Sequence, residues 1–159
     1  MFGPVPRGGR SSLMRVDFYQ LSRDSAEAVL PLIAERTLAA GERLLAVSGD
    51  DAQLARLAQG LWERGGGAFL ANGFAGSAHD PRQPILLSDR AEAANGAAYL
   101  ALADGVWRDE ASSFARVFLL FGAETIEAAR RQWRALDAVD GAERHYWEQG
   151  EGGKWEQRA

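Results

Sequence analysis

The sequence of 159 residues has no cysteine, two histidines (His79 and His145) and a single lysine, Lys154. Without cysteine, the chain forms no disulfide and has no thiolate metal ligand or cysteine nucleophile. Two histidines so far apart in the sequence disfavour a zinc site or a histidine-based catalytic triad. A phosphate-binding loop of the Walker A type requires a lysine directly after its glycines, and Lys154 has no such context. We therefore predict a protein that is not an enzyme, with no catalytic residue, no metal and no cofactor.

Long apolar runs are also missing, since no segment approaches the length of a membrane span. Residues 1–13 lack the apolar core of a signal peptide and are rich in glycine, proline, arginine and serine. We predict that they form a disordered leader or extension, and that one α/β domain spans residues 14–157. The predicted compartment is the cytoplasm, with no membrane partner.

An excess of basic residues is missing as well. The net charge is −4, and the 25% of charged residues is ordinary for a globular protein. Domains that bind duplex DNA are usually basic, so we expect any association with DNA to be indirect. The 47% of hydrophobic residues is enough for a folded core.

The folded part opens with an alternation of strands and helices. Residues 15–21 alternate apolar and polar side chains, which predicts a strand with one buried face. Residues 26–40 carry apolar side chains at helical spacing, and Gly41 ends this helix. A continuous apolar run at 43–48 and a second amphipathic helix at 52–64 follow. This order predicts an α/β fold with a parallel sheet.

The rest of the chain continues this alternation less regularly. The clearest late element is a helix at 125–136, and the segment after Gly141 is expected to be a polar, glycine-rich tail. Strands are predicted at 84–88, 97–103 and 114–121, a helical turn at 89–95 and a loop at 72–83.

Doubly wound α/β folds bind phosphates at the turns that follow their first strands. Here the first such turn, residues 21–25, has no glycine, and the second, residues 48–51, holds two aspartates that repel a phosphate. The glycines at 65–67 follow a helix, where the sign of the helix dipole disfavours an anion. A nucleotide-binding enzyme therefore stays an alternative that only the α/β alternation supports.

The last predicted helix has one unusual face. Arg130, Trp133 and Arg134 lie three and four residues apart and therefore share it. Two guanidinium groups beside an aromatic ring suit a carboxylate next to an apolar side chain. A solvated arginine face with a half-buried tryptophan is the simpler alternative. Arg131 is expected to pair instead with Glu127, four residues earlier.

A series of short motifs extends over nearly the whole folded part. They are Phe18-Tyr19-Gln20-Leu21, Gly41-Glu42-Arg43-Leu44-Leu45, Leu61-Trp62, Phe69, Gly76, Pro84-Ile85, Ala129-Arg130-Arg131-Gln132-Trp133-Arg134, Gly141, Tyr146-Trp147 and Gly153-Lys154-Trp155. No single motif is decisive, but in this order and combination they resemble the chi subunit family of bacterial DNA polymerase III.

The resemblance implies a Rossmann-like domain, with a mixed, largely parallel sheet flanked by helices and without a nucleotide site. It implies a non-catalytic accessory subunit of the polymerase III holoenzyme, associated with the clamp loader in DNA replication. The implied partners are the psi subunit and the acidic C-terminal tail of single-stranded-DNA-binding protein, which ends in phenylalanine. The family's tail-binding positions correspond to Trp62, Phe69, Arg130 and Trp133, with Leu119 as an apolar neighbour.

On this basis we predict how the tail binds. Its terminal phenylalanine is expected to insert between Trp62, Phe69 and Trp133. Arg130 is expected to hold the α-carboxylate, and Arg134 to attract the aspartates that precede the phenylalanine.

The sequence departs from the family pattern at two places. Ile126 stands where a lysine often precedes the key arginine by one turn, and Ala71-Asn72 stands where a Pro-His pair is common. The first departure weakens the basic character of the surface or shifts it to Arg134. A direct single-stranded DNA binder, which stacks bases on its aromatic side chains, is the other alternative.

Overall fold

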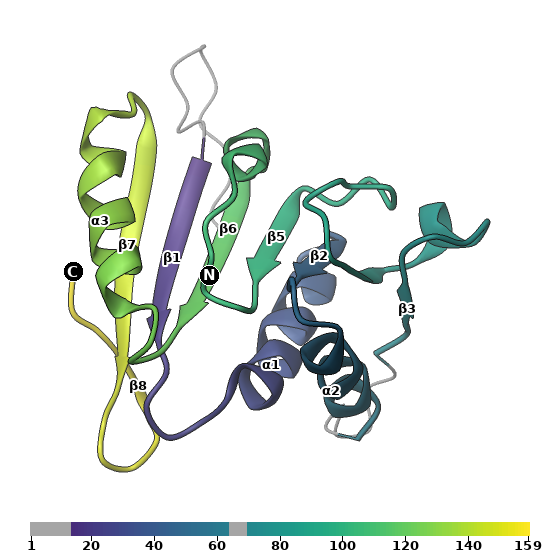
Figure 1. The fold of residues 1–159 in the computed structure, drawn as a ribbon, viewed down its shortest axis with the longest axis horizontal. Helices are drawn as coiled ribbons and strands as arrows, with labels where there is room; N and C mark the ends of the chain where they lie inside the picture. Colours follow the sequence, from purple (N-terminus) through teal and green to yellow (C-terminus); the bar gives the residue numbers. More distant parts are fainter. Residues whose placement is uncertain (1–13, 64–69) are drawn as a thin grey trace.

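An eight-stranded sheet forms the centre of the structure, a computed structural model that describes residues 14–63 and 70–159. The strands lie in the order β3-β4-β2-β5-β6-β1-β7-β8, and neighbours are parallel except for β7 and β8 (Figure 1). This mixed, largely parallel sheet with flanking helices confirms the predicted α/β class. The strands are β1 (Met14–Gln20), β2 (Leu44–Val47), β3 (Asn72–Phe74), β4 (Ile85–Ser88), β5 (Tyr99–Leu102), β6 (Arg116–Phe121), β7 (Ala142–Gln149) and β8 (Trp155–Gln157).

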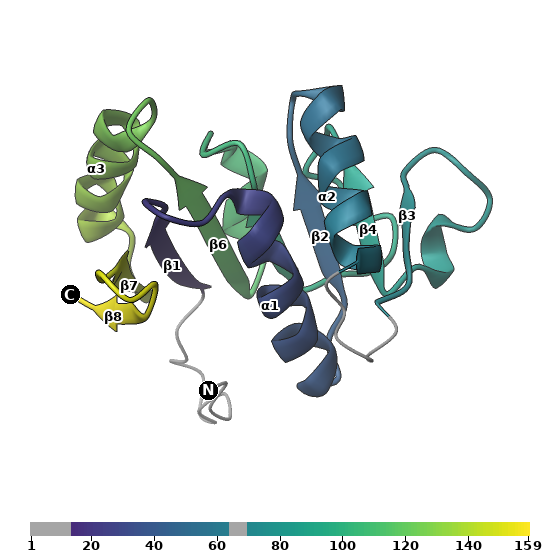
Figure 2. The same cartoon turned by 90° about the horizontal axis from the view of Figure 1, so that it is seen from below.

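Two helices cover one face of the sheet and a third covers the other. The buried residues of α1 (Ala26–Ala39) and α2 (Asp51–Glu63) share a core with Leu44, whereas α3 (Ile126–Ala135) shares a core with Leu45, which points the opposite way. Figures 1 and 2 show α3 at the β7 end of the sheet, apart from the neighbouring α1 and α2. None of the described helices is long and apolar enough to cross a membrane. The short 3-10 helices are η1 (Asp80–Arg82), η2 (Asp109–Ser113) and η3 (Leu136–Ala138).

The direction of the connections explains this placement of the helices. From β1 to β2, and from β2 to β3, the chain moves toward the β3 edge of the sheet. From β6 to β7 it moves toward the β8 edge. Crossovers between parallel strands are right-handed, so movements in opposite directions put their helices on opposite faces. For this reason α1 and α2 share one face, and α3 lies on the other.

The contact between α1 and α2 is close at one point. Ser25 caps α1, because its Oγ accepts a hydrogen bond from the backbone N–H of Ala28 (3.3 Å). Pro31, inside α1, has no N–H to donate to the carbonyl of Glu27. Gly60 of α2 lies against that carbonyl, since a Cβ at this position would be 2.8 Å from the Glu27 oxygen. Glycine thus lets α2 approach α1 where the proline leaves a helical carbonyl without its usual donor.

The structure confirms the helices predicted at 26–40, 52–64 and 125–136. It also confirms the predicted strands, which correspond to β1, β2, β4, β5 and β6. Three other expectations are corrected. Residues 72–83, expected as a loop, contain β3 and η1, and residues 89–95, expected as a helical turn, contain no helix. The segment after Gly141, expected as a tail, forms β7 and β8, and β7 pairs along the whole of β1. This strand is hard to recognise because its two faces carry aromatic and polar residues, with Tyr146 packed on one core and Trp147 on the other.

Candidate functional site

The predicted face of α3 lies at the boundary between the core and the surface, so some of its residues pack on the sheet and others are exposed. Ala129 is buried against the core that contains Leu119 of β6. Trp133 is partly buried against the same core, whereas Arg130 and Arg134 are exposed. Leu119 itself is 1% exposed, so it supports the helix from below and is not a surface residue.

The ring of Trp133 is held by aromatic side chains and by an arginine. Its centroid lies 5.1 Å from that of Phe18 and 5.7 Å from that of Tyr146, both in edge-to-face geometry. The guanidinium carbon of Arg144, on β7, lies 4.5 Å from the Trp133 ring centroid. Arg144 also donates hydrogen bonds to the backbone carbonyl of Trp133 and to the carboxylate of Asp137. Trp133 is therefore fixed in place, with a cation on one of its faces.

Arg130 lies three residues before Trp133, on the same face of α3. Its side chain is 52% exposed, and Nη1 donates a hydrogen bond to Oε1 of Glu127 (3.2 Å). Glu127 thus pairs with Arg130, whereas the sequence had suggested Arg131. Burial raises the pKa of Tyr146, the Arg130 guanidinium acts to lower it, and Glu148 adds to the increase.

Together, Arg130, Trp133, Arg144 and Tyr146 form what we call the arginine–aromatic surface. It joins two cations to two aromatic rings, an arrangement that suits a carboxylate attached to an apolar side chain. Ile126, one turn before Arg130, is partly buried against the core, so it adds packing and no charge. Arg144 and Tyr146 were not predicted as site residues, because the segment after Gly141 was expected to be a tail and not the strand β7.

Trp62 lies elsewhere in the structure. It is near the end of α2, and the residue is 56% exposed. The buried face of α2, which includes Leu61, belongs to the core on the opposite side of the sheet from Trp133. The pocket expected between Trp62 and Trp133 is therefore not formed, because the sheet separates them. Phe69, the remaining residue of that expected pocket, lies outside the described residues.

The exposed ring of Trp62 lies on the same face of the sheet as a second exposed aromatic side chain. Phe74 of β3 is 53% exposed and is in register with Leu87, which belongs to the core beneath α2. Among the described strands, β3 pairs only with β4, so it lies at the edge of the described sheet. We call Trp62 and Phe74 with this edge the Trp62–Phe74 surface.

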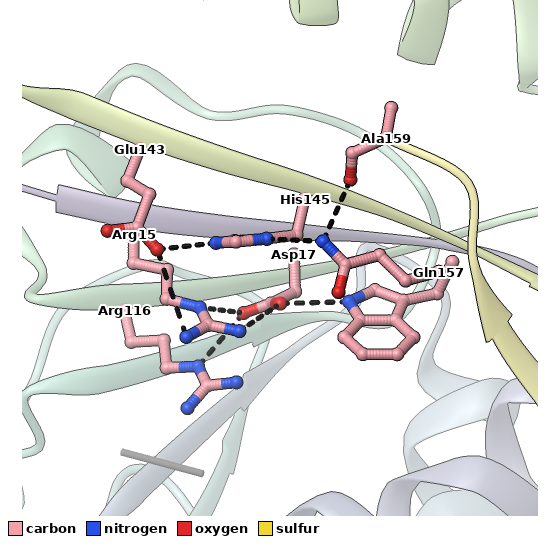
Figure 3. A network of polar contacts seen from close by, with 8 residues as sticks. Arg15, Asp17, Arg116, Glu143, His145, Gln157 and Ala159 are labelled. Atoms are coloured by element: carbon pink, nitrogen blue, oxygen red, sulfur yellow. Dashed lines mark hydrogen bonds and ion pairs between the residues drawn. The ribbon is translucent and has the colours of Figure 1, made fainter. Parts of the chain in front are cut away.

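A buried ionic network holds β7 in the sheet on the face that carries α1 and α2. Asp17 of β1 is fully buried and accepts hydrogen bonds from Arg15 (3.1 and 3.2 Å), Arg116 (2.9 Å) and Nε1 of Trp147 (3.0 Å). Figure 3 shows its carboxylate next to both arginines, with Glu143 of β7 close to Arg15. Burial lowers the pKa of Arg116, and the Asp17 carboxylate acts to raise it. The network fixes the strand that supplies two side chains of the arginine–aromatic surface.

Acidic side chains at the carboxyl ends of the parallel strands form turns and caps. Asp104 accepts hydrogen bonds from the N–H of Gly49 (2.9 Å) and from both terminal nitrogens of Arg108 (2.9 Å each). Asp50 accepts one from the N–H of Ala52 at the start of α2 (2.9 Å). In the part of the chain that the structure describes, no three acidic or histidine side chains are arranged to hold a metal ion. Asp104 and Asp50 therefore stabilise the turns after the strands and the start of α2.

Comparison with protein families matches the chain to the family described as DNA polymerase III chi subunit, HolC. The match covers residues 13–142, which is well over half of the chain and includes all of α3. It ends at the first residue of β7, so Arg144 and Tyr146 lie beyond the matched span. No curated protein matches the chain.

Proposed function

The chain belongs to the DNA polymerase III chi subunit family, and from that membership we propose that its arginine–aromatic surface binds the acidic C-terminal tail of single-stranded-DNA-binding protein. As a member of this family, the protein is an accessory subunit in DNA replication. The observation that carries the proposal is the exposed guanidinium of Arg130 on the same face of α3 as Trp133, whose ring packs edge-to-face against that of Tyr146.

The chemistry of the tail matches this arrangement. A C-terminal phenylalanine places a carboxylate and an aromatic ring on the same residue, so its binding surface needs a cation beside apolar area. Arg130 can grip the carboxylate through two parallel hydrogen bonds, and the ring can pack against the edges of Trp133 and Tyr146. Arg134, one turn further along α3, is exposed and can attract the aspartates that precede the phenylalanine.

The expected affinity is modest. A short tail buries little surface, so we expect a Kd near 1 μM, which corresponds to about −8 kcal/mol. The electrostatic part should weaken as salt is added, because the arginines are exposed or partly exposed. Several tails on one oligomeric partner would raise the overall affinity by avidity.

The test is a titration of a fluorescent tail peptide with the full chain and two variants. Arg130→Ala is expected to weaken binding by about tenfold or more, since a hydrogen-bonded ion pair with the ligand is lost. Arg131→Ala is the matched control, because it removes the same charge from the neighbouring residue, which lies off this face. Equal affinities of the two variants would refute the assignment of Arg130.

We further propose that the psi subunit binds the Trp62–Phe74 surface. Two large exposed aromatic side chains on one face of the sheet, one of them on an edge strand of the described sheet, support this, because such surfaces commonly accept a partner chain. The sheet separates this surface from the arginine–aromatic surface, so both partners can bind at once.

Copurification of psi with Phe74→Ser tests this second assignment. We expect psi to be lost while the affinity for the tail peptide is unchanged. Val139→Ser is the control, since it removes another exposed apolar side chain, 43% exposed, that follows η3. Full retention of psi by the Phe74 variant would show that psi binds elsewhere.

A further inference from the structure

The charge of Arg130 is already engaged within the protein. Glu127 lies in the first turn of α3, and its carboxylate accepts a hydrogen bond from Arg130 at 3.2 Å. Both partners are exposed, with 52% of the Arg130 side chain and 71% of the Glu127 side chain accessible. An incoming carboxylate that binds the Arg130 guanidinium must therefore displace the carboxylate of Glu127 or share the guanidinium with it.

We propose that Glu127 is an internal competitor that sets the affinity of the arginine–aromatic surface for carboxylate-ended peptides. The inference rests on the proposed function of this surface. Glu127 acts in two ways: it occupies the guanidinium of Arg130 in the free protein, and it repels an acidic peptide at short range. Because exposed ion pairs are weak, the competition lowers the affinity without preventing binding.

The second ion pair of this surface has a different role. Asp137 also pairs with an arginine, Arg144, and its side chain is 69% exposed. Arg144, however, also stacks on the ring of Trp133 and donates to the Trp133 carbonyl, and only 25% of its side chain is exposed. Asp137 therefore helps to hold Arg144 against the ring, whereas Glu127 holds a guanidinium that is otherwise available to a ligand.

The test compares two substitutions that remove the same charge. Glu127→Gln frees Arg130 and should tighten binding of the tail peptide by about two- to fivefold, the range that exposed ion pairs span. Glu124→Gln is the matched control, since Glu124 is exposed, lies three residues earlier and makes no ion pair with any described residue. It should change the affinity by less than about 1.5-fold, because charges at longer range are screened by salt.

A double substitution shows whether the effect acts through Arg130. In an Arg130→Gln background, Glu127→Gln should have no more effect than Glu124→Gln. An equal gain from the two single variants, or a gain that persists in the Arg130→Gln background, overturns the competitor role while leaving the binding site intact. If Arg130→Gln binds the peptide as well as the unmodified chain, the proposed function fails instead, and the two failures are thereby distinguished.

Discussion

Replacement of Asp17 by asparagine tests how strongly the buried network holds the sheet together. The carboxylate is 0% exposed and accepts hydrogen bonds from two arginines and a tryptophan. The variant Asp17→Asn keeps the size of the side chain but removes the negative charge beside Arg116, which is itself buried. Removing one partner of a buried ion pair costs about 3–5 kcal/mol of stability, because the charge of the other partner is left uncompensated.

The lower end of that range applies here, since asparagine keeps one acceptor oxygen for Trp147 or Arg15. A loss of about 3 kcal/mol is a large part of the ~5–15 kcal/mol that stabilises a typical domain. For a chain of this size it corresponds to a decrease in Tm of roughly 6–12 °C. Equilibrium unfolding in urea, followed by circular dichroism, measures the change in the free energy of unfolding.

Glu143→Gln is the control for this experiment. Its carboxylate belongs to the same network but is 45% exposed and lies 3.9 Å from Arg15, so we expect a loss below about 1 kcal/mol. If Asp17→Asn destabilised the protein no more than Glu143→Gln, the reasoning that the network secures β7 would be wrong.

Two further predictions concern stability. Gly60→Ala is expected to destabilise the protein by about 1 kcal/mol, because the new Cβ would lie 2.8 Å from the Glu27 oxygen and overpack the α1–α2 contact. This cost exceeds the stability that alanine adds through its higher helix propensity. A gain in the free energy of unfolding would contradict the close contact. For Asp104, burial alone would raise the pKa, but hydrogen bonds from Arg108, Gly49 and Val106 hold it below its usual value of 3.8. Its stabilising contribution is therefore present at neutral pH and is lost as the pH falls below about 4. Asp104→Asn should lower stability at pH 7 and flatten its decrease between roughly pH 4 and pH 2, which urea unfolding at several pH values measures.

The sequence predicted elements well wherever one periodicity dominates. The apolar alternation of residues 15–21 and the helical spacing of residues 26–40 correspond to β1 and α1. In β7, aromatic side chains occur on both faces of the strand, with Tyr146 against one core and Trp147 against the other. Neither an apolar–polar alternation nor a helical spacing of apolar residues therefore stands out. A usable signal was nevertheless present, since Arg144 and Tyr146 are two residues apart and would share one face of a strand.

The location of Trp62 could not be predicted in the same way. Its place depends on the direction in which each crossover runs along the sheet, and this follows from the strand order. No residue near Trp62 or Trp133 encodes that order locally. The face of α3 was predictable from helical spacing, but the identity of its neighbours from other elements was not.

The central position of β1 determines when the protein can fold during synthesis. The first strand lies between β6 and β7, so both of its neighbours come from the last part of the chain. While the ribosome still holds that part, β1 has no strand to pair with, and Asp17 has neither Arg116 nor Trp147 as a donor. Closure of such long loops slows folding, and it leaves apolar strands exposed in the meantime. We therefore expect the nascent chain to depend on chaperones until β7 has emerged, and a chain that ends before β7 to remain unfolded.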